Sequence, residues 1–236
     1  MKPKHIKPII FNTDMVRAIL EGRKTVTRRI IKPQPLFYTG RNYVFADETC
    51  PKKWEDCDDF VGKCAPYQVG DILYVRETWG DYRECTEDSG GVYVLYRADY
   101  PDGAKQVTHP DGIVYELPKW HPSIHMPKEA ARIWLRVTDV RVERLHGMND
   151  EEAEKEGIGK LFIEDVAFGN KDYGCVEYSD SKGYLGLAKE QFAYLWDSTI
   201  KKNDLPQYGW SANPWVFVIQ FERCENPDLL EVNDNG

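Results

Sequence analysis

The chain has 236 residues, of which 42% are hydrophobic and 13% are aromatic, and its formal net charge is −8. This length and apolar content suffice for one well-packed domain with insertions or for two small domains, and they exclude a largely disordered chain. Proteins that bind long DNA or RNA usually carry an excess of Lys and Arg, because contacts with phosphate dominate their affinity. The acidic balance therefore favours a small or weakly charged ligand.

The sequence carries no feature that would direct the protein out of the cytoplasm. No run approaches the ~20 apolar residues of a membrane-spanning helix. Residues 1–10 combine basic residues with an apolar patch that is too short for a signal peptide. We therefore expect a cytoplasmic protein without a membrane partner.

The cysteines raise the question of a zinc site. Cys50, Cys57 and Cys64 are evenly spaced, and Cys85 is a conceivable fourth ligand. Structural zinc sites usually contain closer pairs, with about two to four residues between the ligands. We therefore expect reduced thiols, no metal and no cofactor, with zinc binding as the alternative.

The predicted elements begin with a short helix over residues 13–21. Thr13 is its expected N-cap, Asp14 lies favourably in the first turn, and Gly22 ends it. Residues 25–31 are rich in β-branched side chains and predict a strand, which stops at the prolines that follow.

The remainder of the chain predicts several strands and two further helices. Strands are expected at 72–79, 91–99, 132–145 and 214–222, and helices at 149–157 and 187–199. In the strand 132–145 the apolar positions change parity at Thr138 and Asp139, which indicates a bulge or turn there. Residues 36–66 look irregular and are expected to be a surface insertion. This mixture of strands and short helices predicts an α+β fold, with a small barrel as one form of it.

The segment GRKTVTRR, residues 22–29, is the most informative stretch for chemistry. In a strand, Thr25, Thr27 and Arg29 share one face, and Val26, Arg28 and Ile30 share the other. Lys24 enters this strand, and its flexible side chain would bend onto the threonine face. A Thr nucleophile, a Lys base and an Arg for anionic charge would suffice for acyl transfer.

This chemistry requires an unusual lysine. A lysine with its ordinary pKa is protonated at neutral pH, so Lys24 must be desolvated or surrounded by positive charge. The neighbouring Arg23, Arg28 and Arg29 would provide such charge. The alternative is that these residues form an ordinary solvated face of a strand.

The same segment resembles the hallmark of the ASCH family, G-x-K-x-x-T/E-x-R after a short N-terminal helix. GDILYVRETW at 70–79, NPWVFVIQFE at 213–222, and the strand and acidic helix at 132–157 match as well. The resemblance is to ASCH proteins of bacteriophages and metagenomes. It implies a PUA-like mixed β-barrel with short flanking helices and surface insertions. The single domain would span 1–224, with insertions near 36–66, 100–120 and 160–186, followed by a polar tail at 225–236.

Small bacterial ASCH proteins that hydrolyse N4-acetylcytidine use a Lys, a Thr and a later Glu. The first two match Lys24 and Thr27, and MNDEEAEKE selects Glu156, although Glu152 and Glu154 lie close by. By this resemblance Thr27 attacks the acyl carbonyl, Lys24 activates Thr27, and Glu156 orients or protonates groups as the amine leaves. Arg29 would contact the substrate or support the oxyanion.

Three further residues are candidates for substrate binding. Arg76, Glu77 and Trp79 lie at the end of a strand after a tight turn, where sites often occur. Glu77 would pair with Arg29 or Lys24, and Trp79 would stack on a base. The equally weighted alternative is a structural Arg–Glu pair and a core tryptophan. In HPSIHMP, residues 121–127, two prolines exclude a helix, so we expect a pocket wall rather than a metal site.

The sequence thus predicts an amidohydrolase that removes acyl groups from the exocyclic N4 amine of acylated cytidine or cytosine derivatives. The first alternative is an RNA-binding or RNA-cleaving PUA-like module, against which the acidic charge counts. The second is a phage accessory protein that binds a host factor without catalysis. Fold analogy alone does not decide among them.

Overall fold

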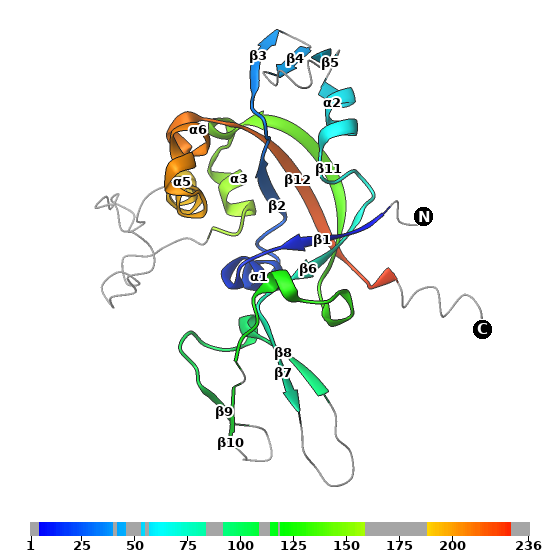
Figure 1. Cartoon of the computed structure of the whole chain (residues 1–236), viewed down its shortest axis with the longest axis vertical. Helices are drawn as coiled ribbons and strands as arrows, with labels where there is room; N and C mark the ends of the chain where they lie inside the picture. Colours follow the sequence, from blue (N-terminus) through cyan, green and yellow to red (C-terminus); the bar gives the residue numbers. More distant parts are fainter. Residues whose placement is uncertain are drawn as a thin grey trace, which may run out of the picture. The chain divides into compact units, whose positions relative to one another are not determined.

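A computed structural model describes residues 5–39, 42–45, 53–54, 57–83, 92–108, 114–117, 119–158 and 188–227. The chain divides into two units. Figure 1 labels the helices and strands. The first unit comprises residues 1–21, 71–136 and 223–236, and the second unit comprises residues 22–70 and 137–222. Both contain helices and strands, so the protein is α+β, as the sequence predicted.

The first unit is built on strands β1 (Ile6–Ile10) and β6 (Ile72–Arg76), which pair in parallel. Strand β6 also pairs antiparallel with the first residues of β11 (Trp134–Arg144). Two antiparallel pairs complete the unit's strands: β7 (Trp79–Arg83) with β8 (Val92–Tyr96), and β9 (Gln106–Thr108) with β10 (Val114–Glu116).

Helix α1 (Thr13–Leu20) lies in the first unit, and its cap differs from the prediction. The N-cap is Asn12, whose side chain accepts a hydrogen bond from the backbone N–H of Met15 at 2.9 Å. Asn12 has the extended backbone that is typical of an N-cap, whereas Thr13, the predicted cap, is the first residue of the helix. Gly22 follows the helix at φ 78°, a conformation that favours glycine, as predicted.

The predicted strand 72–79 is two strands in the structure. Strand β6 ends at Arg76, and β7 begins at Trp79 with a new partner, Tyr96 of β8. The change of partner occurs where Glu77 turns its buried carboxylate onto Arg132. The predicted strand 91–99 likewise ends early, because Arg97–Asp99 form a 3-10 turn.

The second unit contains the rest of β11 together with β2 (Val26–Ile30) and β12 (Trp215–Cys224) as far as residue 222. Strand β12 pairs antiparallel with β2, so that Val218 lies opposite Arg28 and Ile219 opposite Thr27. Within this unit the strand order is β11-β12-β2. In β11 the buried positions change parity between Val137 and Val140, where the sequence indicated a change.

The helices of the second unit are α2 (Cys57–Cys64), α3 (Asp150–Lys155), α5 (Ala188–Thr199) and α6 (Leu205–Tyr208). The N-cap of α3 is Asn149, whose side chain accepts a hydrogen bond from the N–H of Glu152 at 2.9 Å. Gly157 follows at φ 95°. The helices predicted at 149–157 and 187–199 are both confirmed, to within two residues at each end.

The segment 36–66 is more regular than the sequence suggested. Its described parts belong to a three-stranded sheet, β3 (Pro35–Thr39), β4 (Asn42–Phe45) and β5 (Lys53–Trp54), followed by α2. The irregular appearance came from its polar residues and prolines, which a short sheet tolerates at its edges. The predicted insertion at 160–186 and most of the predicted tail lie outside the described residues.

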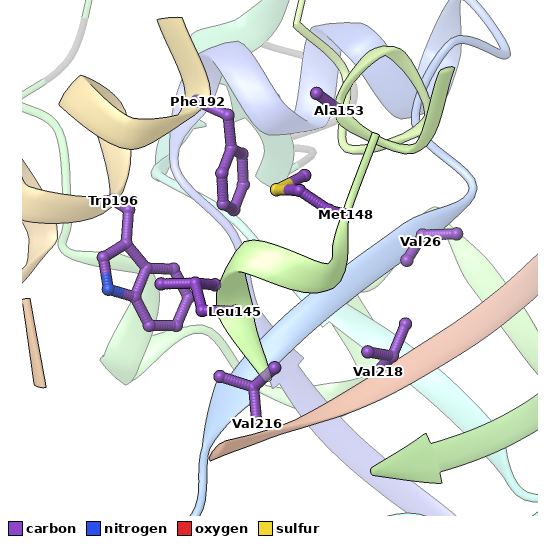
Figure 2. Close-up of a cluster of buried hydrophobic side chains, with 8 residues drawn as sticks. All are labelled: Val26, Leu145, Met148, Ala153, Phe192, Trp196, Val216 and Val218. Atoms are coloured by element: carbon purple, nitrogen blue, oxygen red, sulfur yellow. The ribbon is translucent and has the colours of Figure 1, made fainter. Parts of the chain in front are cut away.

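A hydrophobic core in the second unit packs one face of β2 and β12 against α3 and α5 (Figure 2). The strands contribute valines that share a face through their register, and the helices contribute aromatic and small side chains. Its members are Val26, Leu145, Met148, Ala153, Phe192, Trp196, Val216 and Val218. Hydrophobic burial therefore determines which face of β2 meets α3.

We expect Phe192→Ala to lower the free energy of unfolding by roughly 3–5 kcal/mol, because it removes a buried aromatic ring and leaves a cavity. The matched control is Tyr194→Ala on the same helix, where the side chain is 60% exposed. That change should stay within about 0.5 kcal/mol. Denaturant unfolding of both variants measures the difference, and equal losses would contradict the assignment of Phe192 to the core.

Among the described residues, no helix has both the length and the apolar character needed to cross a bilayer.

Candidate functional site

The candidate site centres on the amine of Lys24, immediately before β2 in the second unit. Its side chain is fully buried, and Nζ donates to Glu156 Oε2 at 2.7 Å. The same amine donates to the backbone carbonyls of Val26 and Glu156, both at 2.8 Å. A buried ammonium requires such partners, because desolvation of an unpaired charge is very costly.

Glu156 reaches Lys24 because the end of α3 is tied to the start of β2. Lys24 and Glu156 form an isolated antiparallel bridge, and Thr25 N–H donates to the Lys155 carbonyl at 2.9 Å. Arg23 Nη1 adds a hydrogen bond to the Gly157 carbonyl at 2.6 Å. These contacts join residues at least 130 positions apart, and they place the Glu156 carboxylate, 4% exposed, against the Lys24 amine.

Thr27 lies on the other face of β2. It is buried and stands opposite Ile219, whereas Val26 and Arg28 face the core described above. Among the described residues, Thr27 Oγ makes no hydrogen bond with Lys24 or Glu156. The structure therefore brings Lys24 and Glu156 together, but the predicted convergence of amine and hydroxyl is not formed. The reason is that the Lys24 amine turns onto the Val26 carbonyl instead of the threonine face.

Arg28 contacts the same carboxylate, a role that the sequence did not reveal. Its guanidinium is almost fully buried, and Nη1 donates to Glu156 Oε1 at 3.1 Å. Nη2 donates to Glu152 Oε2 at 3.0 Å. The available signal was strand alternation, which places Arg28 on the same face as Val26, where an unpaired charge would be out of place.

A second arginine extends this network toward solvent. Arg141 Nη2 donates to Glu152 Oε1 at 3.0 Å, and Arg141 also contacts Asp139 and Glu143. Glu152 therefore accepts from Arg28 through one oxygen and from Arg141 through the other. The carboxylates around Arg28 are thus all held by cations.

The surroundings of Lys24 act on its pKa in opposing directions, with a net lowering. Burial lowers the pKa of Lys24, the positive charges of Arg29 and Arg28 lower it further, and Glu156 opposes the shift. The surroundings are thus of the kind that a lysine base requires, a desolvated amine beside other cations.

Arg29 shares the threonine face of β2 and stands opposite Phe217. Burial lowers the pKa of Arg29, while Tyr67 and Glu156 raise it. Burial also raises the pKa of Tyr67, and the charge of Arg29 opposes that shift. Tyr67 is therefore an electrostatic neighbour of Arg29 that sequence reasoning missed, since nothing in its local pattern links it to β2.

The other predicted substrate-binding residues belong to the first unit and have partners there. Glu77 accepts from Arg132 through both oxygens, at 2.9 and 3.0 Å. The predicted pairing of Glu77 with Arg29 or Lys24 is replaced by this ion pair, which also includes Asp99 at 2.7 Å. Burial raises the pKa of Glu77, and Arg132 opposes the shift. Glu77 therefore has a structural ion pair, but its partner is Arg132 and not the Arg76 of the structural alternative.

Arg76 and Trp79 are also engaged within the first unit. Arg76 donates to the backbone carbonyls of Met126, at 2.9 Å, and Ile124. The Trp79 ring packs on His121 with 5.0 Å between centroids, and His121 Nε2 lies 3.0 Å from Asp81 Oδ1. Among the described residues, Trp79 Nε1 has no hydrogen-bond partner.

The zinc site considered for the cysteines can be examined only in part, at Cys57 and Cys64. In the described part of the chain, no cluster of three or more His, Cys, Asp or Glu side chains is arranged to hold a metal. Cys64 is exposed at the end of α2, and Cys57 begins that helix. Cys50 and Cys85 lie outside the described residues.

Comparisons of this chain with protein-family models, with curated proteins and with solved structures found no match.

Proposed function

We propose that the protein is an amidohydrolase that removes acyl groups from the exocyclic N4 amine of acylated cytidine or cytosine derivatives. Thr27 is the nucleophile, Lys24 the base that activates it, and Glu156 the group that exchanges protons with Lys24 and the leaving amine. The observation that carries the proposal is the buried contact of 2.7 Å between Lys24 Nζ and Glu156 Oε2. Lys24 lies three residues before Thr27, which is also buried.

The reaction follows from these groups. Thr27 Oγ attacks the acyl carbonyl carbon, and its proton passes to neutral Lys24. The C–N bond then breaks as N4 takes up a proton, which leaves an acyl ester on Thr27. Water hydrolyses this ester, releases the carboxylic acid and restores the hydroxyl. Arg29, on the same face as Thr27, is the group proposed to bind the substrate or the developing oxyanion.

Catalysis in this scheme requires Lys24 to move. In the free protein its amine is bound to Glu156 and to the Val26 carbonyl, and the hydroxyl of Thr27 lies on the other face. Catalytic hydrogen bonds are often long or unformed in free enzymes and form only with substrate. A proton transferred from Lys24 to Glu156 would weaken their ion pair and release the amine toward Thr27.

We further propose that the chain is an ASCH protein with a PUA-like barrel, of the kind found in phages, and that it acts in the cytoplasm on a small-molecule nucleoside. The support for this is the resemblance of GRKTVTRR and the other matching segments. The charged groups of Arg76 and Glu77 bind Met126 and Arg132, which belong to the first unit. The catalytic proposal therefore depends on second-unit residues alone.

The test is incubation of the purified protein with N4-acetylcytidine, followed by chromatography of cytidine and acetate. We expect both products in equal amounts from the wild-type protein and none from Lys24→Met. A protein that releases no cytidine, but binds RNA in a salt-sensitive manner, would favour the RNA-binding alternative instead.

The pH dependence of kcat/KM provides a separate prediction about Lys24. The rate requires the neutral amine, so kcat/KM should rise with pH and level off below 10.5, the ordinary pKa of lysine. The charged groups around this amine are Glu156, Arg28 and Arg29. Because Arg29 repels the protonated amine, Arg29→Met should move the rise to higher pH.

The measurement is a pH profile for wild type and Arg29→Met, corrected for the spontaneous hydrolysis of substrate in alkali. A rise centred at or above 10.5 in the wild type, or a shift to lower pH in Arg29→Met, would contradict the role of Lys24 as base.

A further inference from the structure

We infer that Arg28 is a positioning residue for the proposed reaction: it fixes the Glu156 carboxylate so that one oxygen is presented to Lys24. This inference rests on the proposed function. It concerns a residue that the G-x-K-x-x-T-x-R pattern leaves open, since the arginine of that pattern is Arg29.

The first argument is the division of the Glu156 carboxylate between two cations. Oε1 accepts from Arg28 at 3.1 Å, and Oε2 accepts from Lys24 at 2.7 Å. A carboxylate bound through one oxygen can rotate about its last side-chain bond, whereas one bound through both oxygens to separate donors cannot. Arg28 therefore determines which oxygen Lys24 meets and in which direction it points.

The second argument is that Arg28 is itself fixed. Glu152 and Glu156 lie four residues apart at the end of α3, so their side chains share one face of the helix. The two terminal nitrogens of Arg28 contact one of these carboxylates each. Arg141 then holds the other oxygen of Glu152 at 3.0 Å. The planar guanidinium thus bridges two points of α3 and fixes the helix end relative to β2.

The third argument is that stability explains this arrangement poorly. Arg28 Nε is buried and has no hydrogen-bond partner among the described residues. A buried donor without a partner destabilises the folded protein. Apolar side chains in place of a buried ion pair are often neutral or stabilising. A valine-lined face that nevertheless contains an arginine is better explained by the geometry that the arginine imposes on Glu156.

The experiment compares steady-state kinetics with N4-acetylcytidine for wild type, Arg28→Met and Arg28→Lys. In Arg28→Met we expect kcat to fall about 10–100-fold, with KM little changed. This is the usual loss when a residue that orients a functional side chain through a hydrogen bond is removed. Arg28→Lys keeps the charge and should recover part of kcat. Removal of the Arg28 charge should also move the rise of the pH profile to higher pH.

Glu152→Gln provides the test if Arg28→Met does not fold, because Glu152 is partly exposed and loses only its charge. We expect a smaller fall in kcat in this variant. Its matched control is Glu151→Gln, an exposed neighbour on the same helix, which should keep the wild-type kcat.

The outcomes separate the two proposals. A wild-type protein that does not hydrolyse the substrate overturns the proposed function, and this inference with it. An active wild type, with Arg28→Met and Glu152→Gln both at wild-type kcat and with an unchanged pH profile, overturns the positioning role alone. Equal losses in Glu152→Gln and Glu151→Gln would also overturn it, since the effect would then belong to the helix and not to Arg28.

Discussion

Thr27→Val should lower kcat for N4-acetylcytidine by at least about 10⁴-fold, because the nucleophile is lost while the shape of the side chain is kept. The protein should remain folded. Thr27 is buried, and its hydroxyl makes no hydrogen bond among the described residues, so a methyl group replaces it without leaving a partner unsatisfied. The loss would therefore report chemistry and not folding.

The control for this variant is Thr138→Val on β11, an exposed threonine of the same unit that loses the same hydroxyl. It should retain wild-type activity. Mass spectrometry of wild type mixed rapidly with substrate should detect an acyl group on Thr27. Full activity in Thr27→Val would remove the nucleophile assignment, whatever the fate of Lys24 and Glu156.

Glu156→Ala should destabilise the protein by roughly 3–5 kcal/mol, the usual effect of removing one partner of a buried ion pair. The change leaves Lys24 and Arg28 without the carboxylate that both contact, and the side chains of these two residues are at most 1% exposed. Guanidinium unfolding at neutral pH measures the effect. The exposed Glu151 supplies the control, since Glu151→Ala should cost no more than about 1 kcal/mol.

A double variant tests the cause of this destabilisation. If the loss comes from uncompensated charge, Lys24→Met combined with Glu156→Leu should be more stable than Glu156→Ala, because the amine is removed and the space is filled by apolar groups. A double variant that is less stable than the single one would show that the hydrogen bonds of Lys24, and not its charge, dominate.

Local features of the second unit were predictable from the sequence. The helix at 149–157 and the strand at 214–222 were predicted from local sequence patterns, close to their observed bounds. Such signals depend on interactions within a few residues, which local composition encodes. The pairing of Lys24 with Glu156 was different, because only the resemblance to a family suggested a partner more than 130 residues away.

The tertiary structure corrected the predictions for Glu77 and Arg28, whose partners are distant in the sequence. Glu77 was placed on the correct segment, but Arg132, 55 residues later in the chain, determined its role. Arg28 was treated as a nearby charge, whereas it contacts two glutamates of α3. No local periodicity encodes such contacts, because they depend on which elements pack together.

Strand β2 illustrates the division between the two sources of information. Strand alternation in the sequence alone determined that Thr27 and Arg28 lie on opposite faces. Only the tertiary structure decided which of those faces receives Glu156. The face with Val26 and Val218 packs against α3 and α5. This hydrophobic packing places the Glu156 carboxylate beside Arg28 and Lys24.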